Sequence, residues 1–197
     1  MPNLLARALR PSAALLLWCA LPALAQQAAP VPPAASGPVY TVEIIVLRAS
    51  SVGAAEDWTV TPAARGFGND SNRSSPLPQL IRILPASDYK LAAMESTLRS
   101  SGAWRPLAHA AWVQSVGVWG DGHAGLSLSD VGVNVPGLSG TIYVERGQYL
   151  HLGFNISYAN GGPTYTINEM RSIKLGDKLY FDHPAFGILA TVSAARR

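Results

Sequence analysis

"TIYVERGQYLHLGFNISY", residues Thr141–Tyr158, is the stretch that decides the fold. After Arg146-Gly147, apolar and polar side chains alternate along Gln148–Tyr158. One face is apolar throughout and consists of Leu150, Leu152, Phe154, Ile156 and Tyr158. The opposite face carries His151, Asn155 and Ser157. Because successive side chains of a strand point to opposite faces, this period of two predicts an antiparallel hairpin between Thr141–Glu145 and Gln148–Tyr158.

The C-terminal side of this hairpin continues the strand-and-turn pattern. Thr164–Lys174 predicts a further strand, and Gly176-Asp177 predicts a tight turn after it. Lys178–Phe181 is expected to return from that turn, and Phe186–Ser193 is expected to be the last strand.

The N-terminal side supplies two more strands. Val39–Leu47, "VYTVEIIVL", is apolar on both faces, which is typical of a strand in the centre of a sheet. Trp104–Val116 alternates with a period of two and predicts another strand. Ala49–Pro78 is rich in Ser, Gly, Asn and Pro, and predicts a long irregular excursion.

One helix is expected between these strands. Ser87 can cap a helix that begins at Asp88, and Gly102 is placed where the helix should end. Its apolar stripe consists of Leu91, Met94 and Leu98. The sequence therefore predicts an α+β domain with a mainly antiparallel sheet of about five to seven strands and one principal helix packed on a face.

The N-terminal segment is typical of a secretory signal peptide. Arg7 and Arg10 precede a short apolar run, and Ala23-Leu24-Ala25 matches a cleavage site, which predicts a signal peptide over 1–25. A Pro/Ala-rich linker over 26–38 and a single domain over 39–195 follow. We therefore expect an exported protein whose mature chain has no membrane span.

Processing also changes charge and thiol content. Of 15 Lys and Arg residues, Arg7 and Arg10 leave with the signal peptide, whereas all 12 Asp and Glu residues stay, so the mature balance is 13 − 12 = +1. A clustered basic stripe is absent from the sequence, and we expect no nucleic-acid partner. Cys19 is the one cysteine and leaves too, so the mature chain has neither a disulfide nor a catalytic thiol.

The stretch Asp182-His183-Pro184 raises a question of chemistry. It lies between two apolar runs, and it is open to three interpretations: a polar turn, a ligand-binding site, or a catalytic or metal site. Turn chemistry is favoured, because Asp accepts backbone N–H bonds and Pro holds the preceding residue extended. Metal-ligand spacing, a Gly-x-Ser-x-Gly elbow and a phosphate loop are all absent from the sequence. We expect no cofactor.

Aromatic side chains beside amides and guanidinium groups offer a second kind of site. Sugars expose C–H faces that stack on aromatic rings, together with hydroxyls that need hydrogen-bond partners. Trp112 with Gln114, and Tyr180 with Arg171, supply this combination. Packing of these aromatic residues in or on the sheet is the favoured alternative.

Several of these segments together resemble the CsiV family of exported bacterial proteins. The similar blocks are Val39–Arg48, the pair Asp57-Trp58, "WRPLAHAAWVQ" at Trp104–Gln114, Gly147–Tyr158, and "NEMRSIKLGDKLYFDHPAFGILATV" at Asn168–Val192. The last block is the most specific of them. The chain departs from the family pattern in the short Ala49–Pro78 excursion and at Ile167-Asn168-Glu169, where the family has a basic approach to Met-Arg.

The resemblance implies a periplasmic, non-enzymatic factor that binds peptidoglycan, and that cooperates with an outer-membrane lipoprotein activating a peptidoglycan synthase. Two alternatives stay open. One is an accessory subunit of another envelope complex, in which the Gln148–Tyr158 strand adds to a partner's sheet edge. The other is a metal-dependent cell-wall hydrolase that uses Asp182, His183 and His109.

Two groups of residues are the candidates for binding a ligand or partner. The first group lies on one predicted strand and consists of Arg105, His109, Trp112 and Gln114. The second group lies near the C-terminus and consists of Arg171, Tyr180, Asp182 and His183.

Overall fold

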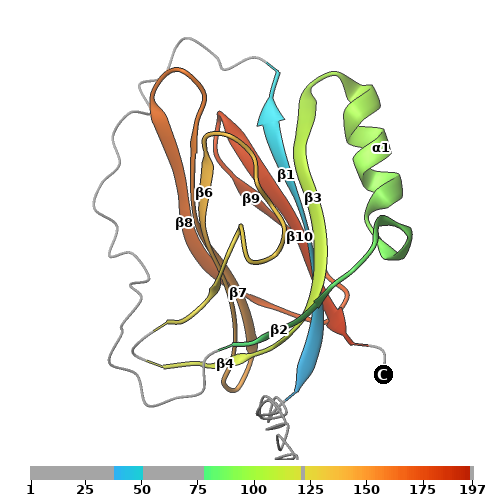
Figure 1. Ribbon diagram of the computed structural model, residues 1–197, viewed down its shortest axis with the longest axis vertical. Helices are drawn as coiled ribbons and strands as arrows, with labels where there is room; N and C mark the ends of the chain where they lie inside the picture. The colour runs from blue at the N-terminus through green and yellow to red at the C-terminus, as the bar shows by residue number, and fades with distance from the viewer. Residues whose placement is uncertain (1–37, 51–77, 121–122, 196–197) are drawn as a thin grey trace, which may run out of the picture. The chain divides into compact units, whose positions relative to one another are not determined.

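A computed structural model describes residues 38–50, 78–120 and 123–195 of the chain. The expected signal peptide, almost all of the expected linker and most of the Ala49–Pro78 excursion, Asp57-Trp58 included, lie outside these ranges. In the described ranges the strands form two five-stranded sheets, accompanied by one α-helix and one short 3-10 helix (Figure 1).

The first sheet is antiparallel throughout and has the strand order β2-β3-β1-β10-β9. Its strands are β1 (Val39–Ala49), β2 (Leu80–Ile83), β3 (Trp104–Ser115), β9 (Lys178–Asp182) and β10 (Phe186–Ala194). β1 lies in the middle of this order, and Val42 to Leu47 are all buried. The central position predicted from its two apolar faces is therefore confirmed.

The second sheet has the order β4-β6-β7-β8, and β5 pairs with β6. Its strands are β4 (Gly117–Val118), β5 (Leu126–Ser127), β6 (Leu138–Arg146), β7 (Leu150–Ala159) and β8 (Thr164–Ile173). The predicted β6–β7 hairpin is confirmed, with Val144 opposite Leu152 and Ile142 opposite Phe154. β4 and β6 form a parallel pair.

The main core lies between the two sheets. Val42, Ile44 and Val46 of β1 pack in one buried cluster with Leu152 and Phe154 of β7. Alternate residues of both sheets thus face each other, as in a β-sandwich. In Figure 1 the two sheets lie side by side, and α1 lies beyond β3 on the side away from the second sheet.

The prediction of a single sheet was wrong. β9 was expected to return along β8, but it pairs with β10, and β8 belongs to the second sheet. The turn at Gly176-Asp177 therefore carries the chain from one sheet to the other. Alternation shows which residues share a face of a strand, but it does not show which strands are neighbours.

The helix ends as predicted but begins later. α1 spans Ala92–Ser101 and ends at Gly102, whose φ of 73° is the left-handed conformation that glycine favours. The start expected at Asp88 was wrong, because Ala86–Asp88 form the 3-10 helix η1 and the Ser87 side chain makes no cap bond to the helix.

A second, smaller core lies on the outer face of the first sheet. Ile45, Leu47 and Leu189 form it with Leu91, and Leu98 of α1 packs against it. Met94, the third residue of the expected apolar stripe, is 36% exposed.

Within the described ranges no helix is long and apolar enough to cross a membrane.

Candidate functional site

The candidates on β3 divide between the core and the surface. Trp112 and Gln114 are fully buried, so they offer no surface to a ligand. The indole Nε1 of Trp112 donates to Gln114 Oε1 at 2.6 Å, and Gln114 Nε2 donates to the carbonyl of Ser115 at 3.1 Å. Arg105 is exposed near the start of β3, whereas His109 lies beneath α1.

Among the C-terminal candidates, Arg171 reaches the backbone of β9, whereas the Tyr180 ring lies on the outer face of the first sheet. Arg171 donates to Glu169 and, at 3.0 Å, to the carbonyl of Tyr180, and its guanidinium lies 4.9 Å from the centre of the Phe181 ring. The Tyr180 ring packs on the outer core and covers Gly187, where an added Cβ would lie 2.4 Å from the Tyr180 hydroxyl. Burial, together with the charge of Asp182, raises the pKa of Tyr180.

Asp182-His183 forms the corner between β9 and β10. The His183 N–H donates to the Phe186 carbonyl at 3.1 Å, and the Phe186 N–H donates back to His183 at 3.2 Å. Inside this turn the Ala185 N–H donates to His183 Nδ1 at 3.2 Å. Burial lowers the pKa of His183, so the ring is a neutral acceptor. The geometry is that of the predicted polar turn.

The residues of the hydrolase alternative do not meet. His109 is on β3 and Asp182 is on β9, and β1 and β10 lie between these strands. In the part of the chain that the structure describes, no three His, Cys, Asp or Glu side chains are grouped to hold a metal ion.

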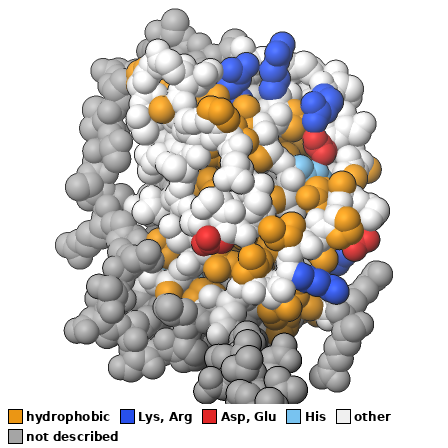
Figure 2. All heavy atoms as spheres, viewed as in Figure 1, with side chains coloured by type: hydrophobic (Ala, Val, Ile, Leu, Met, Phe, Trp, Pro, Cys, Tyr) orange, Lys and Arg blue, Asp and Glu red, His pale blue; other side chains and the backbone are white. Residues whose placement is uncertain are grey.

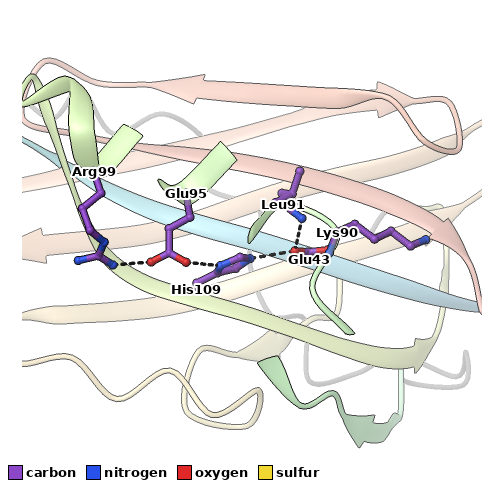
Figure 3. A network of polar contacts seen from close by, with 6 residues as sticks. All are labelled: Glu43, Lys90, Leu91, Glu95, Arg99 and His109. Atoms are coloured by element: carbon purple, nitrogen blue, oxygen red, sulfur yellow. Dashed lines mark hydrogen bonds and ion pairs between the residues drawn. The ribbon is translucent and has the colours of Figure 1, made fainter. Parts of the chain in front are cut away.

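A chain of charged side chains joins α1 to the first sheet (Figure 3). His109 Nε2 lies 2.8 Å from Glu43 Oε1, and His109 Nδ1 lies 2.8 Å from Glu95 Oε2. Because each ring nitrogen faces a carboxylate, both must donate, and the ring is an imidazolium. Arg99 continues the chain by donating to Glu95 from one turn further along α1.

The pKa values of these groups follow from competing effects. Burial by itself lowers the pKa of His109, but the hydrogen bonds and charges of Glu43 and Glu95 outweigh it and raise the pKa. Burial by itself raises the pKa of Glu43, but His109 and the backbone N–H groups of Leu91 and Lys90 outweigh it and lower the pKa. The contact with His109 is the main cause of the lowered pKa of Glu95.

Glu43 also determines where α1 begins. Its two carboxylate oxygens accept the backbone N–H groups of Lys90 at 2.9 Å and Leu91 at 2.7 Å. Leu91 is the N-cap residue of α1 and has no side-chain cap. Glu43, a residue of the first sheet, thus caps the start of α1 in place of Ser87. The available signal was an acid in the middle of the apolar run Val39–Leu47.

An aromatic surface lies at the β6–β7 hairpin and was missed as a site by the sequence analysis. We call Trp119, Tyr149 and His151 the Trp119 platform. The rings of Trp119 and His151 stack, with centroids 3.7 Å apart and planes at 22°. Trp119 is 41% exposed and Tyr149 is 62% exposed. The available signal was a tryptophan in the glycine-punctuated stretch Gly117–Gly137.

The hairpin backbone holds the platform in place. The Trp119 N–H donates to the Arg146 carbonyl at 3.2 Å. A Cβ added at Gly147 would lie 3.1 Å from Trp119 Cβ, so glycine permits the close approach. Beside the platform, His123 Nδ1 lies 2.6 Å from Glu145 Oε2, and the Glu145 side chain is fully buried.

The strand of the accessory-subunit alternative has no free edge. β7 pairs with β6 on one side and with β8 on the other along most of its length. It therefore cannot extend a partner's sheet, because both rows of its backbone groups are already bonded.

The family model described as "Peptidoglycan-binding protein, CsiV" matches residues 12–195 of the 197-residue chain. The chain belongs to the CsiV family. This membership confirms the resemblance that was noted in the sequence. Neither the curated proteins nor the solved structures gave a match to this CsiV chain.

Proposed function

We propose that this chain is a non-enzymatic, periplasmic protein that binds peptidoglycan and thereby supports cell-wall assembly, alone or with an outer-membrane lipoprotein that activates a synthase. The description of its family supports the binding. The observation that carries the proposal is the Trp119 platform, in which one exposed aromatic ring is held rigid by a second ring.

The platform suits the chemistry of a glycan strand. A sugar ring can lay its C–H face on an aromatic ring, and an aromatic side chain that is held rigid loses little freedom on binding. Tyr149 adds a second aromatic side chain on the adjacent hairpin loop, with a hydroxyl for hydrogen bonds. The glycan is held by stacking and hydrogen bonds, without a reaction.

Sedimentation of the mature protein with purified sacculi tests this function. We expect the wild-type protein to pellet with sacculi in the absence of any envelope extract. Trp119→Ala should lower the affinity about fivefold, because an aromatic contact contributes about 1 kcal/mol and about 1.4 kcal/mol corresponds to a factor of ten. Leu175→Ala is the matched control, since Leu175 is an exposed apolar residue in the turn after β8.

Each outcome decides a part of the proposal. Wild-type protein that stays in the supernatant with sacculi overturns direct peptidoglycan binding. Pelleting that needs a purified envelope lipoprotein assigns the contact to that partner. Equal pelleting of Trp119→Ala and Leu175→Ala removes the platform from the binding surface while leaving the function in place.

A further inference from the structure

A pocket lies at the opposite end of the β6–β7 strands from the Trp119 platform. It has a volume of about 270 Å³ and lies where β1 ends, between the β7–β8 hairpin and the β9–β10 corner. We call it the Arg48 pocket. Its lining includes Arg48, Tyr158, Asn160, Tyr165 and Ala185.

Arg48 brings a positive charge to the mouth of the space between the sheets. It follows Val42, Ile44 and Val46 at the same period of two, and these three residues form part of the main core. Its pairing partner on β10 is Phe186, which is also in the main core. The register therefore directs the Arg48 side chain toward the second sheet rather than toward α1.

The Nε–H of the Arg48 guanidinium is an unpaired donor within the ranges that the structure describes. Arg48 Nε is buried and has no hydrogen-bond partner among the residues that the structure describes. No carboxylate in those ranges forms an ion pair with Arg48 either. A buried donor on a permanent charge is costly when it stays unpaired, and a bound anion would remove that cost.

The walls of the pocket limit what kind of anion fits. Tyr158 is buried, the Tyr165 ring lies 5.2 Å from the ring of His183, and both tyrosines line the pocket together with Arg48. Asp182 shares a side of β9 with Tyr180, which packs on the outer core, so its charge is directed away from the pocket. The pocket suits a carboxylate attached to a small, partly apolar group.

The surroundings of the pocket are basic as well. Arg105 is the pairing partner of Arg48 on β3. Arg105 and Arg99 line a neighbouring pocket of about 440 Å³ at the loop between α1 and β3. Figure 2 shows Lys and Arg side chains gathered at this end of the face, which is the upper end in the view. A positive end attracts an anionic polymer from a distance.

We propose that the Arg48 pocket binds a carboxylate group, and that the carboxylates of the peptide stems of peptidoglycan are its ligands. The proposal rests on the proposed function and adds a second contact to it. The Trp119 platform contacts the glycan, and the Arg48 pocket contacts the peptide. Arg48 is suited to this role because its planar guanidinium can hold a carboxylate with two parallel hydrogen bonds.

The test uses NMR titration of the mature protein with two small probes. One is muramyl dipeptide, which carries a carboxylate on its peptide, and the other is chitotetraose, a neutral N-acetylglucosamine oligomer. We expect muramyl dipeptide to shift the Arg48 Nε–H resonance. Arg48→Gln should weaken its binding at least tenfold, since a charge-assisted pair is lost. Chitotetraose should bind both proteins equally.

Two controls keep the result interpretable. Lys178→Gln removes an exposed charge from the end of β9 that is far from the β9–β10 corner, and at 0.15 M salt it should change the affinity for muramyl dipeptide less than about threefold. Muramyl dipeptide with its carboxylate amidated should bind the wild-type protein as weakly as the free acid binds Arg48→Gln. This second control needs no variant, and it decides the question even if Arg48→Gln does not fold.

The pocket proposal is overturned if the amidated probe binds as well as the acid, or if Arg48→Gln keeps wild-type affinity. Failure of the proposed function gives a different pattern, in which the wild-type protein does not pellet with sacculi and chitotetraose causes no shifts. In that case a response of Arg48 to muramyl dipeptide would still assign the pocket to a carboxylate.

Discussion

At the scale of single residues, Trp112 and Gln114 show how a polar pair becomes part of a core. Both side chains are fully buried, and the indole N–H has its acceptor in Gln114 Oε1. In the sequence, the indole of Trp112 and the amide of Gln114 matched the pattern of a sugar-binding pair. The exposure of a residue, however, depends on whether another sheet covers it, and the second sheet covers this face.

Removal of both partners of this pair should cost less than the two single removals added together. Gln114→Leu leaves the buried indole N–H without an acceptor and should lower the free energy of unfolding by about 2 kcal/mol. The double variant Trp112→Phe/Gln114→Leu should lose less than the sum of the two single variants, because no unpaired donor remains. Urea denaturation of the four proteins measures this cycle, and strict additivity would contradict the account.

His183 shows what could be predicted of a residue from the sequence alone. Asp, His and Pro between two apolar runs indicated a turn, and the turn is formed by bonds within His183–Phe186. Such local bonds connect neighbouring residues, so the local sequence contains all the participants. The Trp119 platform was not predictable in this way, because its stacking partner His151 comes from a different strand.

At the scale of elements, the start of α1 depends on a strand. The carboxylate of Glu43 accepts the N–H groups of Lys90 and Leu91. The residues that lead into α1 are therefore anchored to β1. The sequence placed the cap at Ser87, a residue type that often caps helices. The tertiary contact with Glu43 prevailed, because its full negative charge is a stronger acceptor than a hydroxyl.

Substitutions at Glu43 and Ser87 distinguish which of these two residues caps α1. Glu43→Ala leaves the N–H groups and His109 without their buried partner, and should lower the free energy of unfolding by about 3 kcal/mol. Ser87→Ala is the matched control and should change it by less than about 0.5 kcal/mol, since Ser87 is exposed and does not cap α1. Guanidinium denaturation measures both. A larger loss for Ser87→Ala would restore the cap expected from the sequence.

At the scale of the whole molecule, the Glu43–His109–Glu95 chain couples protonation to the stability of the fold. Glu43 and Glu95 have pKa values lowered from 4.5, so their contribution is present above pH 4.5 and is lost as the pH falls through their folded values. His109 has a pKa raised from 6.5, so its contribution is complete below pH 6.5 and is lost as the pH rises through the folded value. The chain therefore stabilises the fold most between these two limits.

Thermal unfolding across pH 4 to 9, a range of about five units, tests this coupling. The difference in Tm between wild type and His109→Gln should be largest between pH 4.5 and 6.5 and should shrink at higher pH. His183→Gln is a control for which the Tm difference should depend on pH with the opposite sign. Because the pKa of His183 is lowered, its stabilising contribution should be complete above pH 6.5 and should be lost as the pH falls through the folded value. A pH-independent difference for His109→Gln would contradict the imidazolium assignment.

The features that could be predicted from the sequence are those that depend on local periodicity. These are the strands β1, β3 and β6 to β10, the central position of β1, the β6–β7 hairpin, the glycine end of α1 and the corner at His183. Each is encoded within a few residues, because side-chain alternation and turn conformation are properties of short segments.

The neighbours of each strand, and the polar groups that meet, could not be predicted from the sequence and depend on the packing of the whole fold. Two sheets formed instead of one because β9 pairs with β10 rather than with β8. His109 meets Glu43 across 66 residues of sequence, and the Arg48 pocket is closed by the β7–β8 hairpin and the β9–β10 corner. The physical reason is that burial and pairing depend on the packing of distant segments, and no local pattern records it.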